Sequence, residues 1–258
     1  MVEQITSTQN QRVKLTKTLQ TKARARRGER KMVLEGHRLI GDALSRNRRP
    51  LFAFYSESNE GTPLLNQLRA AGTELLPASD DVVKYVSDTE NTSGLVGVFT
   101  IPMPELPNNP LRMLVLDAVR EPGNMGTILR TAGAAGVELV ILSPGCVDPY
   151  NPKVLRSGMG AHFRVPIVEA SWQEIATFCE STQIFVATGD AEERYTSVDW
   201  TQPWTLIIGN EAHGVSDNAR ALGGIPVAIP MAESTESLNA AGATAVILFE
   251  AVRQRSIS

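Results

Sequence analysis

The stretch 206–216 reads LIIGNEAHGVS, and it joins an apolar run to a polar loop. The apolar run 206–208 is followed directly by Gly209, and a second glycine is found at Gly214. A short apolar run bounded by glycine is typical of a strand in a parallel sheet that is covered on both faces. Loops after such strands form the usual ligand-binding edge of an open parallel sheet. Taken alone, the stretch fits an ordinary strand–loop turn equally well.

Similar strands and helices are predicted to alternate around this stretch. The predicted strands are 113–116, 139–142, 184–187, 206–208 and 227–229, and the predicted helices are 125–135, 172–179, 217–222 and 238–255. This alternation predicts an α/β fold with a mainly parallel sheet. Shorter patterns before residue 101 predict a smaller α/β module. Its predicted strands are 32–34, 51–55 and 94–100, and its predicted helices are 13–19, 38–44, 63–71 and 80–86.

A proline-rich segment separates the two patterns. Residues 101–110 read IPMPELPNNP and contain four prolines in ten positions. Proline lacks a backbone donor and stiffens the chain, so this segment is predicted to be an extended linker. We therefore predict a first domain over 1–100, a linker over 101–110 and a second domain over 111–258.

Positive charge is concentrated in the first part of the chain. Residues 1–50 hold 13 of the 25 Lys and Arg and 4 of the 28 Asp and Glu, a formal charge of +9, whereas the rest carries −12. Such a cluster favours a polyanionic partner, nucleic acid first, although a solvated helical face explains it about as well. The candidate RNA-binding residues are Lys22, Arg24, Arg26, Arg27, Arg30 and Lys31.

Composition and missing motifs exclude several classes of protein. The 258 residues are 42% hydrophobic and contain no apolar run long enough for a membrane-spanning helix. Two cysteines and three scattered histidines argue against a disulfide scaffold and against a metal site. No secretory pattern opens the chain, so a cytoplasmic protein is expected. Neither G-x-G-x-x-G after a strand nor a P-loop occurs, so any cofactor must be held in another way.

Two further segments carry polar residues at predicted strand-to-helix turns. Residues 116–130 read LDAVREPGNMGTILR, with Asn124 predicted as a helix N-cap and Arg130 within two turns of it. An ordinary capped helix with a surface arginine explains this segment too. Residues 229–246 read IPMAESTESLNAAGATAV, where Ser237 could simply cap the helix. The small residues of that helix can pack closely against other backbone, within the chain or across a dimer.

The order and combination of the three segments are more specific than any one of them. N-x-G-x-x-x-R from Asn124, G-N-E-x-x-G from Gly209, and I-P-M followed by S-L-N from Ile229 resemble the SpoU/TrmH family of SPOUT RNA methyltransferases. The first domain resembles that family's RNA-substrate-binding module through 5–14 and 34–40. The resemblance is nearly full-length.

This resemblance implies a fold and an activity. The expected fold class is α/β, a SPOUT-type parallel sheet with a C-terminal trefoil knot, preceded by a small ribosomal-protein-like α/β domain. The knot is an exception to the rule that chains do not thread loops. The expected reaction is methyl transfer from S-adenosylmethionine to a ribose 2′-hydroxyl of RNA, with no metal ion and with a homodimer formed through the catalytic domain.

The resemblance also implies which residues act. The expected cofactor-contacting residues are Gly209, Asn210, Ile229, Met231 and Leu238, and the expected catalytic and RNA-contacting residues are Asn124, Arg130, Glu211, Ser237 and Asn239. The guanidinium of Arg130 is always protonated, so we expect it to hold phosphate and stabilise negative charge, with Glu211 as its anchor. The first domain favours ribosomal RNA of the large subunit over transfer RNA. The alternatives are a transfer-RNA methyltransferase, a non-catalytic RNA-binding or ribosome-assembly protein, and a small-molecule enzyme with an incidental basic segment.

Overall fold

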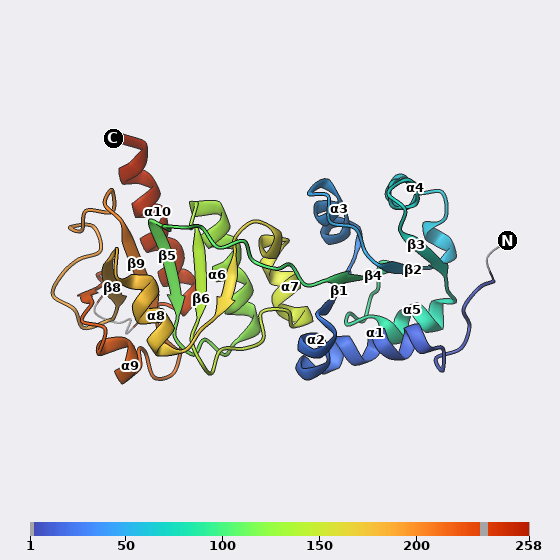
Figure 1. Ribbon diagram of the computed structural model, residues 1–258, viewed down its shortest axis with the longest axis horizontal. Helices are drawn as coiled ribbons and strands as arrows, with labels where there is room; N and C mark the ends of the chain where they lie inside the picture. The colour runs from blue at the N-terminus through green and yellow to red at the C-terminus, as the bar shows by residue number, and fades with distance from the viewer. Residues whose placement is uncertain (1–2, 233–236, 258) are drawn as a thin grey trace. The chain divides into compact units, whose positions relative to one another are not determined.

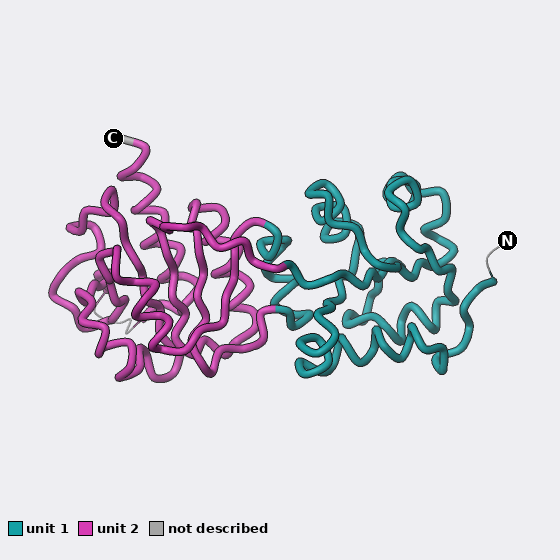
Figure 2. Tube along the Cα trace, in the orientation of Figure 1, with its two compact units in different colours: residues 1–102, 150–163 teal, residues 103–149, 164–258 magenta. Residues whose placement is uncertain are grey.

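The computed structural model describes residues 3–232 and 237–257, and its chain forms two compact units. Unit 1 contains residues 1–102 and 150–163, and unit 2 contains 103–149 and 164–258 (Figure 2). The chain therefore passes between the units three times. The first passage falls within the proline-rich segment 101–110, and residues 150–163, predicted as part of the second domain, group with unit 1. Within the described residues, no helix is long and apolar enough to cross a membrane.

Unit 1 is built on a sheet with the order β1-β4-β2-β3. Its strands are β1 (Lys31–Glu35), β2 (Phe52–Tyr55), β3 (Glu74–Pro77) and β4 (Leu95–Thr100). β4 pairs antiparallel with both β1 and β2, whereas β2 and β3 are parallel. All four residues of β2 are buried, because helices cover both faces of the sheet.

The helices of unit 1 divide between two apolar cores. They are α1 (Gln11–Thr21), α2 (Ala23–Glu29), α3 (His37–Ser45), α4 (Pro63–Ala70) and α5 (Asp80–Val86), with a 3-10 turn at Glu57–Asn59. Side chains of α1 and α5 pack with alternate residues of β2 and β4 in one core, and those of α3 and α4 pack in the other. The alternation of side chains along each strand separates the two cores.

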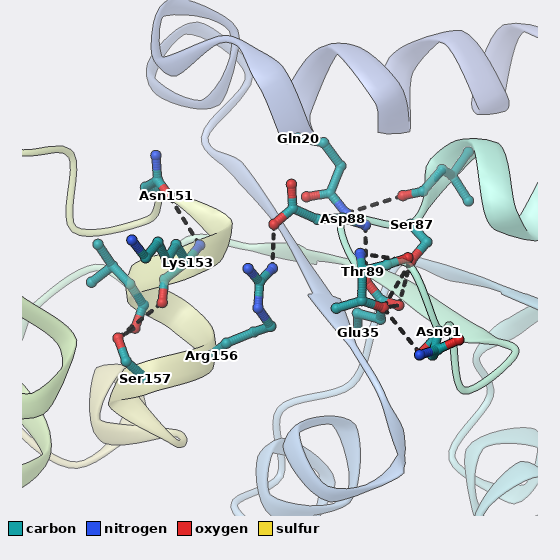
Figure 3. Close-up of polar contacts among 12 residues, drawn as sticks. Gln20, Glu35, Ser87, Asp88, Thr89, Asn91, Asn151, Lys153, Arg156 and Ser157 are labelled. Carbon is teal, nitrogen blue, oxygen red and sulfur yellow. Dashed lines mark hydrogen bonds and ion pairs between the residues drawn. The ribbon is translucent and has the colours of Figure 1, made fainter. Parts of the chain in front are cut away.

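A helix from the second half of the sequence completes unit 1. α7 (Pro152–Gly158) packs on β1 and contacts a 3-10 turn at Ala161–Phe163, and Leu155, 2% exposed, lies in the core of α3 and α4. An ion pair joins Arg156 of α7 to Asp88 (Figure 3). The backbone N–H of Asp88 donates to Glu35 Oε2 at 3.0 Å, so the carboxylate at the end of β1 orders the loop that meets α7.

Unit 2 contains a fully parallel six-stranded sheet with the order β10-β8-β9-β5-β6-β7. Its strands are β5 (Arg112–Leu116), β6 (Leu139–Leu142), β7 (Ile167–Glu169), β8 (Gln183–Ala187), β9 (Trp204–Ile208) and β10 (Ile225–Val227). The α/β fold with a parallel sheet is confirmed. The last strand ends at Val227, two residues earlier than predicted, and β7 was not predicted.

Helices cover both faces of the sheet in unit 2. They are α6 (Pro122–Ala135), α8 (Trp172–Cys179), α9 (Asp217–Arg220) and α10 (Ala240–Ile257). α8 and α9 pack on one face with alternate residues of β5, β6 and β9, while α6 and α10 pack against each other behind the strands (Figure 1). All strands are parallel, so the loops that follow β5, β6, β8, β9 and β10 emerge at one edge of the sheet.

The position of α7 predicts that Leu155→Ala destabilises unit 1. Removing this buried side chain leaves a cavity against β1 and should lower the free energy of unfolding by about 2–5 kcal/mol. Leu106→Ala, at a side chain that is 46% exposed, should cost less than about 0.5 kcal/mol. Denaturant unfolding measures both, and hydrogen exchange should show faster exchange of the β1 amides in Leu155→Ala only. Equal free energies of unfolding for the two variants would contradict the prediction that packing of α7 on β1 stabilises unit 1.

Candidate functional site

A cavity of about 350 Å³ opens at the carboxyl ends of β8, β9 and β10. Its walls come from the loops after these strands and from the first turns of α10. The lining residues that follow the strands or precede the helix are Thr188, Gly189, Asp190, Gly209, Asn210, Glu211, Gly214, Val215, Ile229, Met231, Ser237 and Leu238. Its size and its mixture of apolar walls and a few polar groups fit a small-molecule site.

The loop after β9 folds back on itself at the cavity. Asn210 and Gly214 exchange two backbone hydrogen bonds, 2.8 Å and 2.9 Å long. A Cβ atom at Gly209 would lie 2.3 Å from the backbone carbon of Gly214, so no larger residue fits without moving the loop. Glycine at 209 is therefore required by the approach of two backbone segments, not by an unusual φ angle.

Asn210 fastens this loop to the loop after β5. Its Nδ2 donates to the carbonyl oxygen of Ala118 at 2.7 Å, and its Oδ1 accepts from the N–H of Ala212 at 2.9 Å. Ala118 has a φ of 51°, a left-handed conformation that costs about 1–2 kcal/mol for a residue with a Cβ. The loop after β5 is thus held in an unfavourable backbone conformation with its carbonyl oxygen turned toward Asn210.

Asn124 does not cap α6, so that prediction is wrong. The helix begins earlier, at Pro122, and the Glu121 side chain accepts from the N–H of Gly123 at 3.3 Å. Proline is favoured at the first helical position because it has no N–H to satisfy there. Asn124 lies inside the first turn, and its Nδ2 donates to Glu211 Oε1 at 2.9 Å. Two motif residues 87 positions apart in sequence therefore meet.

Arg130 lies further along α6 and points into solvent. It does not line the cavity, and within residues 3–232 and 237–257 the structure gives it no hydrogen bond or ion pair. The expected anchoring of Arg130 by Glu211 is not present, because the described contact of Glu211 is to Asn124. The guanidinium is left exposed and uncompensated.

The last motif spans the entrance to α10. Ser237 and Leu238 line the cavity, but Asn239 does not. Asn239 Oδ1 accepts from the N–H of Gly242 at 2.7 Å, so Asn239, and not Ser237, caps the helix. Ser237 is exposed, and it is free of a capping role. Residues 233–236, between Met231 and Ser237, lie outside the described residues.

All five residues expected to contact a cofactor line the cavity. Gly209 and Asn210 come from the loop after β9, Ile229 and Met231 from the segment after β10, and Leu238 from the approach to α10. Ile208, Val227 and Ile247 add apolar wall. The catalytic set divides, because Glu211 and Ser237 line the cavity while Asn124, Arg130 and Asn239 do not.

The basic stretch of unit 1 forms α2 and the start of β1. Lys22, Arg24, Arg27 and Arg30 are exposed, and Lys31 is half-buried with an ion pair to Glu29 of 2.9 Å. Arg26 differs from this group. It is 3% exposed, and its Nη1 donates to the carbonyl oxygen of Leu19 at 2.5 Å, at the end of α1. A buried guanidinium used in this way supports the helix end, so Arg26 is not available to an RNA backbone.

Two polar residues near the cavity were not singled out from the sequence. Thr188 follows β8 and lines the cavity, and its buried Oγ1 has no hydrogen-bond partner within 3–232 and 237–257. Asp117 follows β5, is 2% exposed and accepts from the N–H of Ser216 at 2.6 Å. An aspartate directly after a buried strand was the available signal for the second residue. For Thr188, a single threonine after β8, the sequence contains no comparable signal.

Cys146, in the loop after β6, is not a reactive thiolate. Burial is the main reason that the pKa of its thiol rises to about 11, and the negative charge of Asp117 acts in the same direction. The Sγ contacts the carbonyl oxygen of Leu116 at 3.2 Å. The thiol is therefore protonated at neutral pH and does not serve as a nucleophile.

Two family models together match most of the chain. Residues 112–249 match the SpoU rRNA Methylase family, and residues 10–97 match the MRM3-like substrate binding domain. The chain belongs to the SpoU rRNA methylase family. Among curated members, it is 34% identical to the mitochondrial rRNA methyltransferase 3 of Mus musculus, over 88% of this chain and 68% of that protein.

Two bacterial relatives match almost end to end. The 23S rRNA (guanosine(2553)-2′-O)-methyltransferase RlmP of Bacillus subtilis is 30% identical, over 96% of this chain and 98% of that one. The crystal structure of the AdoMet-bound rRNA methyltransferase from Sinorhizobium meliloti has a TM-score of 0.86 and 30% identity, over 98% of each chain. The match includes both units.

The close approach at Gly209 predicts that Gly209→Ala disrupts the loop after β9. The added methyl group meets backbone, so the loop must move, and overpacking of this kind costs about 1–3 kcal/mol of unfolding free energy. Gly133→Ala is the matched control, because a Cβ there would lie 3.7 Å from its nearest neighbour, an ordinary contact. Thermal unfolding and amide exchange across 209–216 measure the effect. Unchanged protection of these amides in Gly209→Ala would contradict it.

Proposed function

We propose that this chain transfers a methyl group from S-adenosylmethionine (AdoMet) to a ribose 2′-hydroxyl in large-subunit ribosomal RNA. The observation that carries the proposal is that two of the motif segments line one cavity, through Glu211 and through Ile229 and Leu238, while the third segment reaches the cavity rim through the hydrogen bond from Asn124 to Glu211. The relatives named for 2′-O-methylation and for rRNA support the reaction and the substrate class.

The residues at the cavity fit AdoMet. Ile208, Val227 and Ile247 offer apolar surface to an adenine ring. Gly209 brings backbone close to the cavity, where N–H and carbonyl groups can bind polar edges of a ligand. Among the described residues, Thr188 supplies a buried hydroxyl that still lacks a partner. Gly209, Asn210, Ile229, Met231 and Leu238 would hold the cofactor.

Transfer depends on alignment and on managing one proton. Bound AdoMet would supply an electrophilic methyl group on a sulfonium; a bond from the ribose oxygen to that methyl would form as the sulfur–methyl bond breaks and the neutral thioether leaves, a displacement that requires no metal ion. The chain must align the ribose oxygen with the methyl group and accept a hydrogen bond from the ribose hydroxyl, whose proton is lost during transfer. Asn124 donates to Glu211, which fixes the amide plane and leaves its carbonyl oxygen to accept from the ribose hydroxyl. Ser237 and Asn239 would complete the polar surroundings of the RNA.

Arg130 would act through its charge. A guanidinium stays protonated, so it is a poor general base, but it binds phosphate in a bidentate manner and stabilises negative charge on the attacking oxygen. The guanidinium of Arg130 is exposed and forms no ion pair with any residue that the structure describes, so it is available for this role. The side chain of Glu211 accepts a hydrogen bond from Asn124 and does not form an ion pair with Arg130 among the described residues.

Unit 1 would bind the RNA outside the reaction centre. Lys22, Arg24, Arg27 and Arg30 present exposed positive charge on and beside α2, which suits the phosphate backbone irrespective of sequence. Identity of the RNA would come from shape and unpaired bases. Within this proposal, unit 1 is a ribosomal-protein-like domain.

The finer features of the fold and assembly belong to the same proposal. The loop after β9 and the described residues that follow β10 would take part in the trefoil knot, and α10 would form the homodimer interface, which is supported by Phe249, 50% exposed on that helix. Gly242 and Val246 lie on the same helical face as Phe249, as expected for close packing. A cytoplasmic location stays a prediction, because curated relatives include mitochondrial enzymes.

The role of Arg130 is tested by two substitutions. Arg130→Ala should abolish methylation, and Arg130→Lys should lower kcat at least about a hundredfold, because a single ammonium cannot replace a bidentate clamp. RNA affinity should stay within about twofold in both. Arg194→Lys, at another exposed arginine of unit 2, is the control and should retain activity. Transfer of labelled methyl groups to large-subunit rRNA measures kcat. Full activity of Arg130→Lys would contradict the proposal that Arg130 binds phosphate in a bidentate manner. If the wild-type protein binds AdoMet but transfers no methyl group, the proposed methyltransferase activity is wrong.

The role of α2 is tested by removing its charge. Arg24→Gln combined with Arg27→Gln should weaken RNA binding and lower the slope of log affinity against log salt by about 0.7–0.9 for each lost phosphate contact. AdoMet binding should not change. Arg48→Gln combined with Lys84→Gln removes two exposed charges outside the stretch and is the matched control. Equal loss of RNA affinity in both double variants would contradict a specific role for α2.

A further inference from the structure

Asp117 is a buried carboxylate at the edge of the sheet where the cavity opens. It directly follows β5 and is 2% exposed. Its backbone N–H donates to the carbonyl oxygen of Ile208 at 2.8 Å, so it lies beside the end of β9. The motif residues assigned above do not include it, and its side chain does not line the cavity.

The two carboxylate oxygens of Asp117 connect the loops that follow three neighbouring strands. Oδ2 accepts from the backbone N–H of Ser216 at 2.6 Å, in the loop after β9. Oδ1 accepts from Ser143 Oγ at 3.4 Å, just after β6. Ser143 Oγ in turn accepts from the N–H of Ala118 at 3.0 Å. A short bond from a backbone N–H to a carboxylate is stronger than a bond between neutral groups.

The loop after β9 is consequently held at both of its ends. Asn210 fastens its beginning to the carbonyl oxygen of Ala118, and Asp117 fastens its end at Ser216. Adjacent residues of the β5 loop thus provide both attachment points. The cavity-lining residues between them include Glu211, Gly214 and Val215. Ser216 also caps α9 by accepting from the N–H of Ala219 at 3.3 Å, so the end of the loop cannot shift without disturbing that helix.

We propose that Asp117 is a positioning residue for the cofactor-binding loop, and this inference rests on the proposed function. Through Ser216 it sets the distance between the loop and the walls formed by Ile229 and Leu238. Without the carboxylate, the N–H of Ser216 loses its acceptor and the loop can move away from the cavity. Removal of the Asp117 carboxylate should therefore lower the affinity for AdoMet, whereas the affinity of unit 1 for RNA should not change.

Two substitutions at Asp117 and one control separate positioning from general stability. Asp117→Ala should raise the Kd and the KM for AdoMet about tenfold or more, in keeping with loss of a hydrogen bond to a charged group. Asp117→Asn keeps an oxygen acceptor of the same size and should recover part of that loss. The KM for RNA should stay within about twofold in both. Isothermal titration with AdoMet and methyl-transfer kinetics give these values.

Thr205→Val is the matched control within the same sheet. Thr205 is fully buried in β9, and its Oγ1 shares a 2.6 Å hydrogen bond with Thr182 Oγ1, away from the cavity. This variant should lower the melting temperature without changing AdoMet affinity. The proposal is overturned if folded Asp117→Ala binds AdoMet as the wild type does. It is also overturned if AdoMet affinity falls in the Asp117 variants and in Thr205→Val alike, in proportion to lost stability. Failure of the wild type to bind AdoMet would instead contradict the proposed function.

Discussion

Two hydrogen bonds from the loop after β9 to the adjacent residues Asp117 and Ala118 hold the site together. They fix a loop that has little apolar side chain to bury and would otherwise be mobile. This fixed loop carries Glu211 to Asn124, and it brings the backbone at Gly209 against that of Gly214. The left-handed conformation of Ala118 is accepted at this point because its carbonyl oxygen must face Asn210.

The site is organised for binding and alignment more than for proton abstraction by a basic group. Glu211 is engaged with Asn124, and the thiol of Cys146 is kept protonated by burial. The exposed guanidinium of Arg130 is a permanent positive charge, suited to an anion that arrives with the substrate. In such a site, rate comes from placing a nucleophilic oxygen against an already reactive methyl group.

Short apolar runs that alternate with helical patterns made much of the fold predictable. The predicted strand at 139–142 and the predicted helix at 172–179 have the bounds of β6 and α8. The short elements β3, β7, α2 and α7 were missed, because three to seven residues give little periodicity and their burial depends on distant partners. The five residues expected to contact a cofactor were chosen by motif resemblance, and all five line the cavity. The cap of α6 was misplaced because Pro122 and Glu121 start the helix earlier, and the side-chain contacts of Asp117 are to Ser143 and Ser216, which lie 26 and 99 positions away in sequence.

The three passages of the chain between the units limit how the protein can be divided. A fragment cut at the proline-rich segment would carry 150–163 without the strand on which it packs, and Leu155 would meet water together with Tyr150, Met159 and Phe163. Such a fragment would be prone to aggregate. A chimera that borrows unit 1 from a relative must therefore also borrow 150–163, so recombination between family members is expected to exchange two separated pieces of sequence at once.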